Sequence, residues 1–187
     1  MKIISIYNNE KQLIKKAAAG NREAQKRIYE RFAPKMLGVC RQYVKDLHFA
    51  EDVMISGFLK VFKNLGSFGF KGSFEGWIRK IMVRESISYK RKQQFVVYDD
   101  GLFERNGIEA DTISADIDVE YIQILIDALP EGYKMVFVLY VVEGYKHQEI
   151  AELLQISEST SKSQLFKARK LLQEQLQHQN IIGYGSR

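Results

Sequence analysis

The stretch LLQISESTSKSQLFKARKLL, Leu153 to Leu172, decides the fold of the C-terminal part of the chain. Apolar residues recur at helical spacing on both sides of a serine-rich interruption, which predicts two helices joined by a tight turn. Ser157 is a favourable N-cap for the second helix, and Glu158 places a negative charge where the helix dipole favours one. A short helix, a tight turn and a longer basic helix form the helix-turn-helix pattern.

The two faces of that second helix differ in chemistry. At 100° per residue, its buried stripe comprises Ser161, Leu165, Ala168 and Leu172. The opposite face carries hydroxyls, one aromatic ring and cations: Ser159, Thr160, Ser163, Phe166, Lys167 and Lys170. Small hydroxyls let a helix approach DNA closely and hydrogen-bond phosphates or base edges, while lysines meet phosphates. This face is a candidate DNA contact, although helix pairs of this shape also occur as pure packing.

The remaining apolar patterns are also helical. Ala24, Ile28 and Phe32 recur at four-residue spacing after Asn21, a favourable N-cap. Pro34 is expected to bend or restart that helix, because proline removes a backbone donor. Further on, two stripes at helical spacing comprise Met54, Phe58, Val61 and Leu65, and Ile122, Ile126 and Leu129. The sequence therefore predicts an all-α protein.

Charge divides the chain into three parts. Residues 1–92 contain 20 Lys and Arg against 8 Asp and Glu, residues 93–120 contain 1 against 8, and residues 121–187 contain 7 against 7. We predict two small helical domains joined by a flexible acidic linker, with the helix-turn-helix in the second domain. The positive excess of the first domain indicates a polyanionic partner, nucleic acid above all.

The segment FGFKGSFEGWIRKIMVRESISYKRKQ, residues 68–93, combines aromatic and cationic side chains. Ser73 follows two glycines and is predicted to cap a helix that begins at Phe74. Aromatic residues gather at its start and cations follow: Phe68, Phe70, Phe74 and Trp77, then Arg79, Lys80, Arg84, Lys90, Arg91 and Lys92. Single-stranded nucleic acid binds such surfaces, since bases stack on rings at about 1–3 kcal/mol each. Each ring also fits a core position, Trp77 above all.

Other patterns argue against catalysis, a cofactor or a small-molecule substrate. His48, His147 and His178 lack metal-ligand spacing, and GSFGFKG lacks the lysine-serine ending of a phosphate-binding loop. Cys40, the single cysteine, is expected to be a small buried residue. No apolar run approaches the roughly 20 residues that span a bilayer, and the N-terminus lacks a secretion signal. We expect a cytoplasmic protein that is not an enzyme and has no direct membrane insertion.

Two segments resemble conserved regions of bacterial sigma factors. Residues 50–92, AEDVMISGFLKVFKNLGSFGFKGSFEGWIRKIMVRESISYKRK, resemble the second region, and residues 129–172, LPEGYKMVFVLYVVEGYKHQEIAELLQISESTSKSQLFKARKLL, resemble the fourth. With a short linker between them and no third domain, nearly the whole chain is similar to the extracytoplasmic-function (ECF) group. The resemblance implies an initiation subunit that directs core RNA polymerase to promoter DNA. An anti-sigma factor is a further partner that it suggests.

The resemblance also implies roles for individual residues. In the helix near residues 50–65, core polymerase binding would involve Glu51, Asp52, Ile55, Phe58 and Lys60. Binding of the −10 element, as duplex and as melted non-template strand, would involve Phe70, Lys71, Phe74, Trp77, Arg79, Lys80, Arg84 and Arg91. Reading of the −35 element would involve Ser159, Thr160, Lys162, Ser163, Gln164, Lys167 and Lys170. By the same analogy, the acidic linker would lie in the RNA-exit path of the polymerase.

The chain departs from the family pattern at five positions: Ile55, Ser56, Arg84, Ser161 and Gln164. Ile55 and Ser56 replace a polar pair in the core-binding helix, and Arg84 replaces a common asparagine of the −10 helix. Ser161 replaces a branched apolar residue, which is expected to loosen packing. Gln164 replaces a frequent arginine, and glutamine pairs with adenine where arginine pairs with guanine. We therefore expect unusual promoter preferences.

Two other functions remain open from the sequence. One is an autonomous helix-turn-helix repressor or activator whose N-terminal module binds a ligand or dimerises. The other is a DNA-processing enzyme, such as a recombinase, although no nucleophile with supporting arginines is evident. A repressor binds its duplex tightly without polymerase, whereas a sigma factor gives promoter-specific transcription only with core enzyme.

Overall fold

The computed structural model describes the backbone of residues 2–97 and 119–184, with side chains over 10–93 and 121–177. Within these ranges every regular element is a helix, which confirms the predicted all-α class. None of the helices in this part of the chain combines the length and the apolar character that crossing a bilayer requires.

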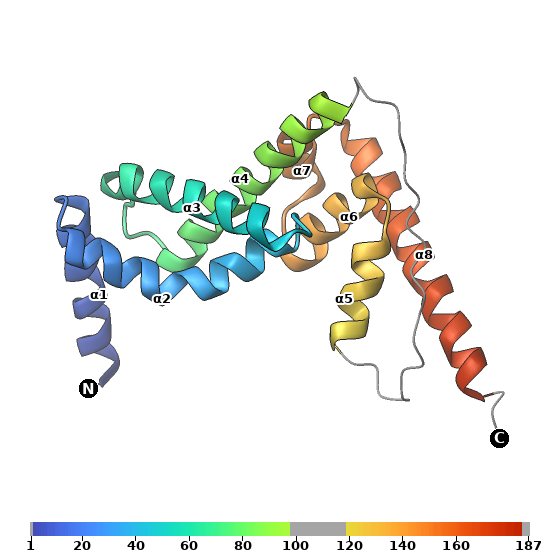
Figure 1. Ribbon diagram of the computed structural model, residues 1–187, viewed down its shortest axis with the longest axis horizontal. Helices are drawn as coiled ribbons and strands as arrows, with labels where there is room; N and C mark the ends of the chain where they lie inside the picture. Colours follow the sequence, from blue (N-terminus) through green and yellow to red (C-terminus); the bar gives the residue numbers. More distant parts are fainter. Residues whose placement is uncertain (1, 98–118, 185–187) are drawn as a thin grey trace. The chain divides into compact units, whose positions relative to one another are not determined.

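The helices form two compact units, Met1–Asp100 and Gly101–Arg187 (Figure 1). The described part of the first unit comprises α1 (Lys2–Ala18), α2 (Arg22–Arg41), α3 (Leu47–Asn64), the 3-10 turn η1 (Leu65–Ser67) and α4 (Phe74–Val97). The second comprises α5 (Val119–Ala128), α6 (Glu131–Phe137), the π-helical η2 (Val138–Val142), α7 (His147–Leu154) and α8 (Glu158–Tyr184). The α7–turn–α8 pair is the predicted helix-turn-helix.

The predicted linker, residues 93–120, falls mostly outside the described residues, which omit 98–118. The backbone of α4 continues through Val97, and α5 begins at Val119. The exact domain boundaries stay a prediction.

Local signals set the start of α2 and α3. Gly20 has a φ of +85°, and Asn21 Oδ1 accepts a hydrogen bond from the backbone N of Ala24 at 2.9 Å. This is the predicted N-cap of α2. Asp46 caps α3 in the same way, because its Oδ1 accepts from Phe49 N at 3.0 Å.

Pro34 lies inside α2, which continues through it to Arg41, so the helix does not restart there. An internal proline costs about 3 kcal/mol or more, because it removes one backbone hydrogen bond and crowds the preceding turn. Phe32 and Met36 are buried on either side of it. Burial of this helix face against α3 and α4 offsets the cost.

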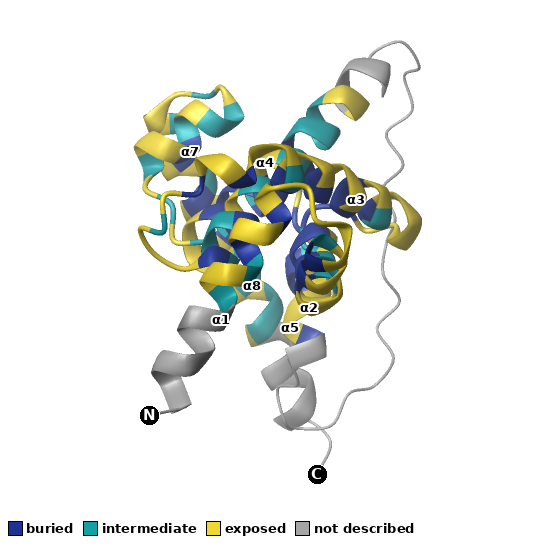
Figure 2. Cartoon of the chain, turned by 90° about the vertical axis from the view of Figure 1, so that its left-hand side faces the viewer, coloured by how far each residue is buried: buried dark blue, intermediate teal, exposed yellow. Residues whose placement is uncertain are grey.

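The core of the first unit lies where α2, α3 and α4 face one another (Figure 2). Ile28, Met36, Ile78 and Met82 are fully buried there. Gly57 leaves room for the Met82 side chain between α3 and α4, since a Cβ at this position would require the sulfur of Met82 to move. Cys40 is buried in the same unit, as predicted.

In the second unit, α6 and α7 pack on α8 (Figure 1). Val136, Leu139 and Ile150 are buried at this contact. Lys134 is also buried, and its ammonium is 2.5 Å from the carboxylate of Asp127 on α5. A charge therefore lies in the core of this unit, and Asp127, seven residues earlier, compensates it.

Candidate nucleic-acid interface

The N-terminus of α8 carries a cluster of hydroxyls. Ser157 Oγ accepts a hydrogen bond from the backbone N of Thr160 at 3.0 Å, which confirms the predicted cap. The same oxygen lies 2.8 Å from Ser159 Oγ and 2.7 Å from Thr160 Oγ1. Ser163 Oγ donates to the Thr160 carbonyl at 3.0 Å. These contacts hold the hydroxyls on the first two turns of the helix.

The opposite face of α8 is packed. Ser161, Leu165 and Ala168 are buried and Leu172 is half-buried, so the predicted buried stripe is confirmed. The Ser161 hydroxyl lies 2.9 Å from Nδ1 of His147, at the start of α7. Ser161 therefore occupies a position where the family pattern has an apolar residue, and its buried hydroxyl still has a hydrogen-bond partner, because α7 supplies one.

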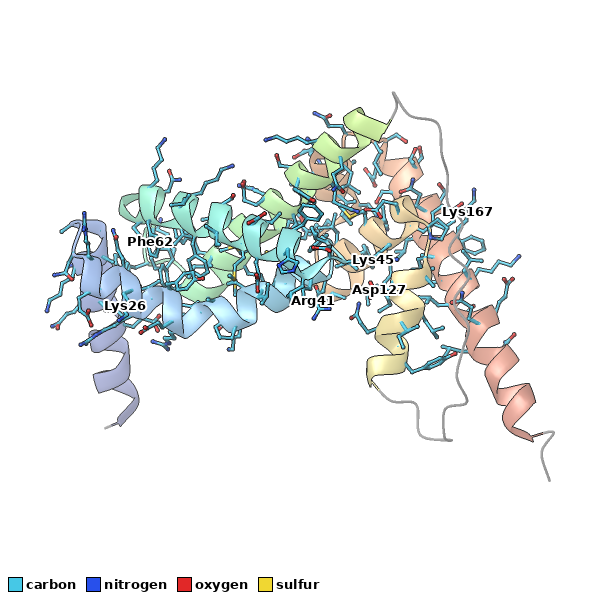
Figure 3. The ribbon with its side chains drawn as sticks, viewed as in Figure 1. Lys26, Arg41, Lys45, Phe62, Asp127 and Lys167 are labelled. Carbon is cyan, nitrogen blue, oxygen red and sulfur yellow. The ribbon has the colours of Figure 1, made fainter. Side chains whose placement is uncertain are left out.

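The structure places most of the predicted −35 residues on the exposed face of α8. Thr160 is half-buried, and the exposed ones are Ser159, Lys162, Ser163, Lys167 and Lys170. The side chain of Lys167 extends from the helix, with its ammonium 5.9 Å from the Tyr133 ring centroid (Figure 3). This face combines hydroxyl donors with positive charge, the chemistry that phosphates and base edges require.

A glutamate modifies this charge. The Glu158 carboxylate is 2.7 Å from the Lys162 ammonium, one helical turn on. The hydrogen bond and the charge of Lys162 lower the pKa of Glu158. Lys162 is therefore partly neutralised within the protein, whereas Lys170 has a looser pair at 3.8 Å with Glu174.

Two side chains on α8 differ from expectation. Gln164 is half-buried against α6, where a Cβ on Gly132 would lie 3.1 Å from its Nε2. Phe166 is 70% exposed, yet it was not among the predicted −35 residues. The helical projection placed Phe166 on the outward face. An apolar residue on a polar face was the available signal, because apolar side chains can contact the methyl group of thymine.

The aromatic cluster of the first unit divides into a buried and an accessible part. Phe68 and Phe74 are buried, and the Phe74 ring meets that of Phe32 edge-on at 5.6 Å. Phe74 was predicted to contact melted DNA, and the structure corrects this, because a ring that is 3% exposed has no face free for a base. Phe74 is part of the core that supports the loop.

The accessible part of the cluster comprises Phe70 and Trp77, both half-buried, with Lys71 exposed beside them. Trp77 stacks on Phe74 with ring centroids 5.9 Å apart and planes within 15° of parallel. The Phe70 centroid lies 5.0 Å from that of Phe68. Buried rings therefore support accessible ones, and a cation lies next to them.

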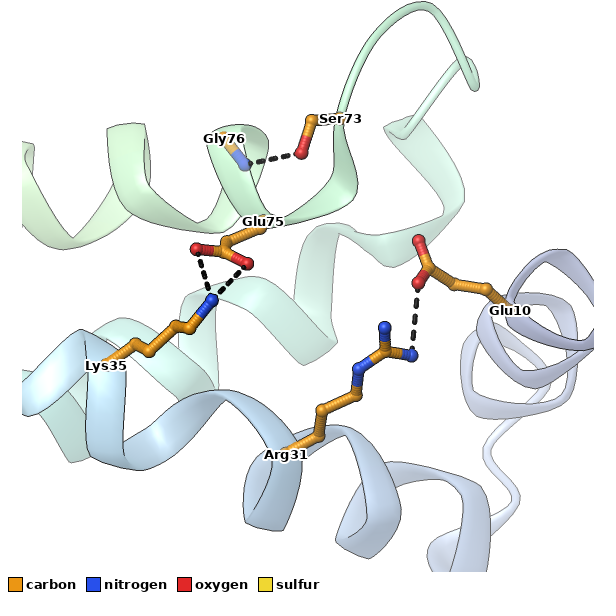
Figure 4. A network of polar contacts seen from close by, with 6 residues as sticks. All are labelled: Glu10, Arg31, Lys35, Ser73, Glu75 and Gly76. Carbon is orange, nitrogen blue, oxygen red and sulfur yellow. Dashed lines mark hydrogen bonds and ion pairs between the residues drawn. The ribbon is translucent and has the colours of Figure 1, made fainter. Parts of the chain in front are cut away.

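Polar contacts fix the start of α4. Ser73 Oγ accepts a hydrogen bond from Gly76 N at 3.2 Å, which confirms its predicted cap (Figure 4). The Glu75 carboxylate binds Lys35 Nζ of α2 at 3.0 and 3.1 Å. Figure 4 shows both contacts on the same turn of α4. The loop is thus attached to α2 immediately after its aromatic residues.

Cations cover the surface of the first unit. Of the predicted −10 residues on α4, Lys80 and Arg84 are exposed, and Arg79 and Arg91 are half-buried. Further exposed cations lie on α2 and the turn after it, including Lys26, Arg41 and Lys45 (Figure 3). The charge excess read from the sequence is therefore displayed on the surface.

The outer face of α3 holds the predicted core-polymerase residues, with one correction. Asp52, Ile55 and Lys60 are exposed and Glu51 is half-buried, and Lys60 forms an ion pair with Glu85 of α4. Phe58 was predicted to contact the polymerase, but it is buried against Tyr29, with centroids 4.8 Å apart.

The sequence prediction missed Leu59 on this face. Leu59 is 67% exposed, four residues after Ile55, which is 47% exposed. Their four-residue spacing on the outward side of a helix was the available signal. An apolar pair among charges on a helix surface is typical of a protein-binding face.

The side chains described over 10–93 and 121–177 include no group of three His, Cys, Asp or Glu placed to share a metal ion. The side chains that both units present at these surfaces are hydroxyls, cations and aromatic rings, groups that contact phosphates and bases.

Comparison with known families assigns both units. Residues 28–96 match the family model for sigma-70 region 2, and residues 120–172 match the model for sigma-70, region 4. The ECF RNA polymerase sigma factor SigW of Bacillus subtilis is 28% identical over 179 residues, which cover 89% of this chain and 96% of SigW. The RNA polymerase sigma-H factor of Pseudomonas aeruginosa is 24% identical and covers 90% of this chain and 94% of its own.

A solved structure shares the fold. The sigma factor RpoE, in complex with the anti-sigma factor NepR from Bartonella quintana, aligns with a TM-score of 0.55 at 22% identity, over 81% of this chain and 96% of RpoE. The match to region 2 falls within the first helical unit of this chain and the match to region 4 within the second. The chain therefore belongs to the sigma-70 family, within its ECF group of RNA polymerase sigma factors.

Proposed function

We propose that this protein binds core RNA polymerase through α3, reads the −35 promoter element with α8, and opens the −10 element with the loop before α4. The observation that carries the proposal is the pairing of two DNA-binding chemistries on separate units. The second unit has a capped helix with outward hydroxyls and cations. The first unit has accessible rings beside cations.

Reading of the −35 element would use the first turns of α8. Hydroxyls of Ser159 and Ser163 and the ammonium of Lys167 would contact phosphates and base edges in the major groove. We add Phe166, whose exposed ring suits a thymine methyl. Gln164 lies against α6, so its amide would read a base only by leaving Gly132. Its role in selecting adenine is therefore secondary in our proposal.

Opening of the −10 element would use Phe70 and Trp77 as surfaces on which an unstacked base of the non-template strand stacks. Lys71 and the exposed cations of α4, Lys80 and Arg84, would hold the phosphates on either side. Arg79 and Arg91, which are half-buried, complete the predicted set. Phe74 contributes by supporting Trp77 from the core.

Binding of core polymerase would use the outer face of α3, where Ile55 and Leu59 form an apolar pair beside Asp52 and Lys60. In this chain Ile55 replaces a residue that is usually polar, and its side chain points outward. An apolar contact would then substitute for a polar one at the same place. The acidic segment 93–120 would run between the two DNA-bound units, in a channel meant for nucleic acid.

Two further expectations belong to the proposal. Members of the sigma family are transcription initiation factors, and we propose that this chain likewise has no reaction of its own and acts in the cytoplasm, where core polymerase is. The solved structures of RpoE with NepR and of CnrH with the cytosolic domain of CnrY are complexes with a second protein. A partner of the anti-sigma kind would hold this chain inactive.

Run-off transcription on a promoter library tests the proposal directly. Purified protein added to core enzyme should give discrete start sites that core alone does not give. Tight and specific binding of a duplex by the protein alone, with no start sites on adding core, would instead indicate the repressor. A variant with Leu59→Glu should lose transcription while its α8 still binds −35 duplex, which separates polymerase binding from DNA reading.

A further inference from the structure

Phe70 has a backbone conformation that needs support. Its φ is +55°, in the left-handed region that a bulky residue rarely adopts. The loop around it also contains Gly69 and Gly72, and Gly72 has a φ of +101°. Residues in sparsely populated conformations persist only where surrounding contacts determine them. The contacts of the Phe70 ring are therefore the features that keep it in place.

The Phe70 ring contacts one residue close to it in sequence and one on another helix. Phe68, which is buried, lies 5.0 Å away between centroids. Lys11 of α1 places its Nζ 5.3 Å from the Phe70 centroid, within the range of a cation–π interaction. Lys11 is itself exposed, so its ammonium reaches the ring at the protein surface.

The position of Lys11 is fixed by its neighbours on α1. The adjacent Glu10 forms an ion pair with Arg31 of α2, with Oε2 and Nη1 3.1 Å apart (Figure 4). Ile14, three residues after Lys11, is buried in the core. A helix anchored on both sides of a residue sets the direction of that side chain. Lys11 is thus aimed at the loop.

We propose that Lys11 is a positioning residue for promoter opening, because its ammonium holds the Phe70 ring where the unstacked base arrives. The inference rests on the strand-opening role proposed above for the loop. It extends the site from the loop and α4 to the N-terminal helix. A cation over a ring at an exposed site changes an equilibrium by about two- to five-fold, which sets the expected size of the effect.

The test uses holoenzyme assembled from core polymerase and full-length variants. Opening is followed by the fluorescence of 2-aminopurine placed in the non-template strand of the −10 element. Lys11→Gln should slow opening about two- to five-fold, and Lys11→Arg should restore it, because guanidinium also binds a ring face. Lys15→Gln, which removes the same charge from an exposed site on the same helix, is the matched control and should open as wild type. Binding of −35 duplex should stay unchanged in all three.

A double-mutant cycle separates positioning from a direct phosphate contact. If Lys11 acts through the ring, Lys11→Gln has no further effect in a Phe70→Ala background. An equal slowing in both backgrounds would show that Lys11 acts independently of Phe70 and would overturn the inference. If Phe70→Ala slows opening but Lys11→Gln does not, only this inference fails. If Phe70→Ala opens as wild type, the strand-opening role of the loop fails, and the inference fails with it.

Discussion

The N-terminal turns of α8 and the aromatic loop before α4 are both candidate DNA contacts, but they are built differently. The hydroxyls of α8 are held by residues within three positions of one another, around the cap Ser157. The loop is held by residues from other helices, among them Phe32 of α2 and Lys11 of α1. The first surface depends on local hydrogen bonds, and the second depends on the packing of the whole first unit.

The largest expected effect is in the first unit, whose packing supports the aromatic loop before α4. Phe74→Ala should destabilise the first unit by about 3–5 kcal/mol, because it removes a buried ring and leaves a cavity. Urea unfolding followed by the fluorescence of Trp77, the single tryptophan, reports this unit. Phe166→Ala, in the second unit and followed by circular dichroism, is the control and should change stability by less than about 0.5 kcal/mol, because its ring is exposed. Similar losses in both variants would contradict the division between core and surface rings.

A pH measurement tests the burial of Cys40 in the core of the first unit. Burial raises the pKa of the Cys40 thiol from 9.0 to about 11, against a hydrogen bond with Ser86 that lowers it. Between pH 9 and 11 the thiol stays neutral in the folded protein and ionises in the unfolded protein. Its contribution to the free energy of unfolding is therefore fully present below pH 9 and is lost as the pH rises toward 11. The loss amounts to about 2–3 kcal/mol by linkage.

The matched variant for that measurement is Cys40→Ala, which has no thiol to ionise. Unfolding of both proteins at several pH values between 8 and 11, followed through Trp77, cancels the titration of the other groups. The wild type should lose more stability over this range than Cys40→Ala. Parallel curves would show that the thiol ionises freely in the folded protein.

Removing the Ser157 cap tests the N-terminal turns of α8, which are held by local hydrogen bonds. Ser157→Ala should destabilise the second unit by about 1 kcal/mol, because the N-terminus of α8 loses its side-chain acceptor. Thermal unfolding by circular dichroism measures this. Affinity for −35 duplex, measured by fluorescence anisotropy, should also fall, since Ser159 and Thr160 lose their hydrogen-bond partner.

Ser157→Asp separates these two effects. Aspartate caps a helix as well as serine does, and its charge suits the helix N-terminus, so stability should return. Its charge also repels phosphate, so DNA affinity should stay low. Recovery of both together would mean that Ser157 is purely structural.

The smallest change in stability is expected on the outward face of α8. Lys167→Ala should leave unfolding nearly unchanged and weaken −35 binding to all sequences alike, because a phosphate contact carries no base information. The slope of log affinity against log salt should become shallower by about 0.9 for one lost contact. Lys26→Ala, in the first unit, is the control and should leave this slope unchanged. An altered sequence preference in Lys167→Ala would instead assign Lys167 to a base.

The helices and the helix-turn-helix followed from apolar spacing, the division into two units followed from the charge distribution, and the caps at Asn21, Ser73 and Ser157 followed from residue type. The outward face of α8 was predicted for the same reason, since it depends only on the helical repeat. Within the candidate sites, prediction was weakest for apolar residues. Phe58 and Phe74 were assigned to surfaces and lie in the core. Leu59 is exposed and was not assigned, and Phe166 was placed on the outward face but left out of the −35 residues.

The sequence by itself determined which segments are helices, where they begin, and which face of α8 carries hydroxyls and cations. Those properties arise from contacts within one or two turns, which the order of residues specifies directly. Only the tertiary structure decided that His147 pairs with Ser161, that Lys11 covers Phe70, and that Gly57 admits Met82. Each of these contacts joins residues at least 14 positions apart. A helical repeat gives the direction of a side chain, but the helix that packs against it decides its depth and its partner.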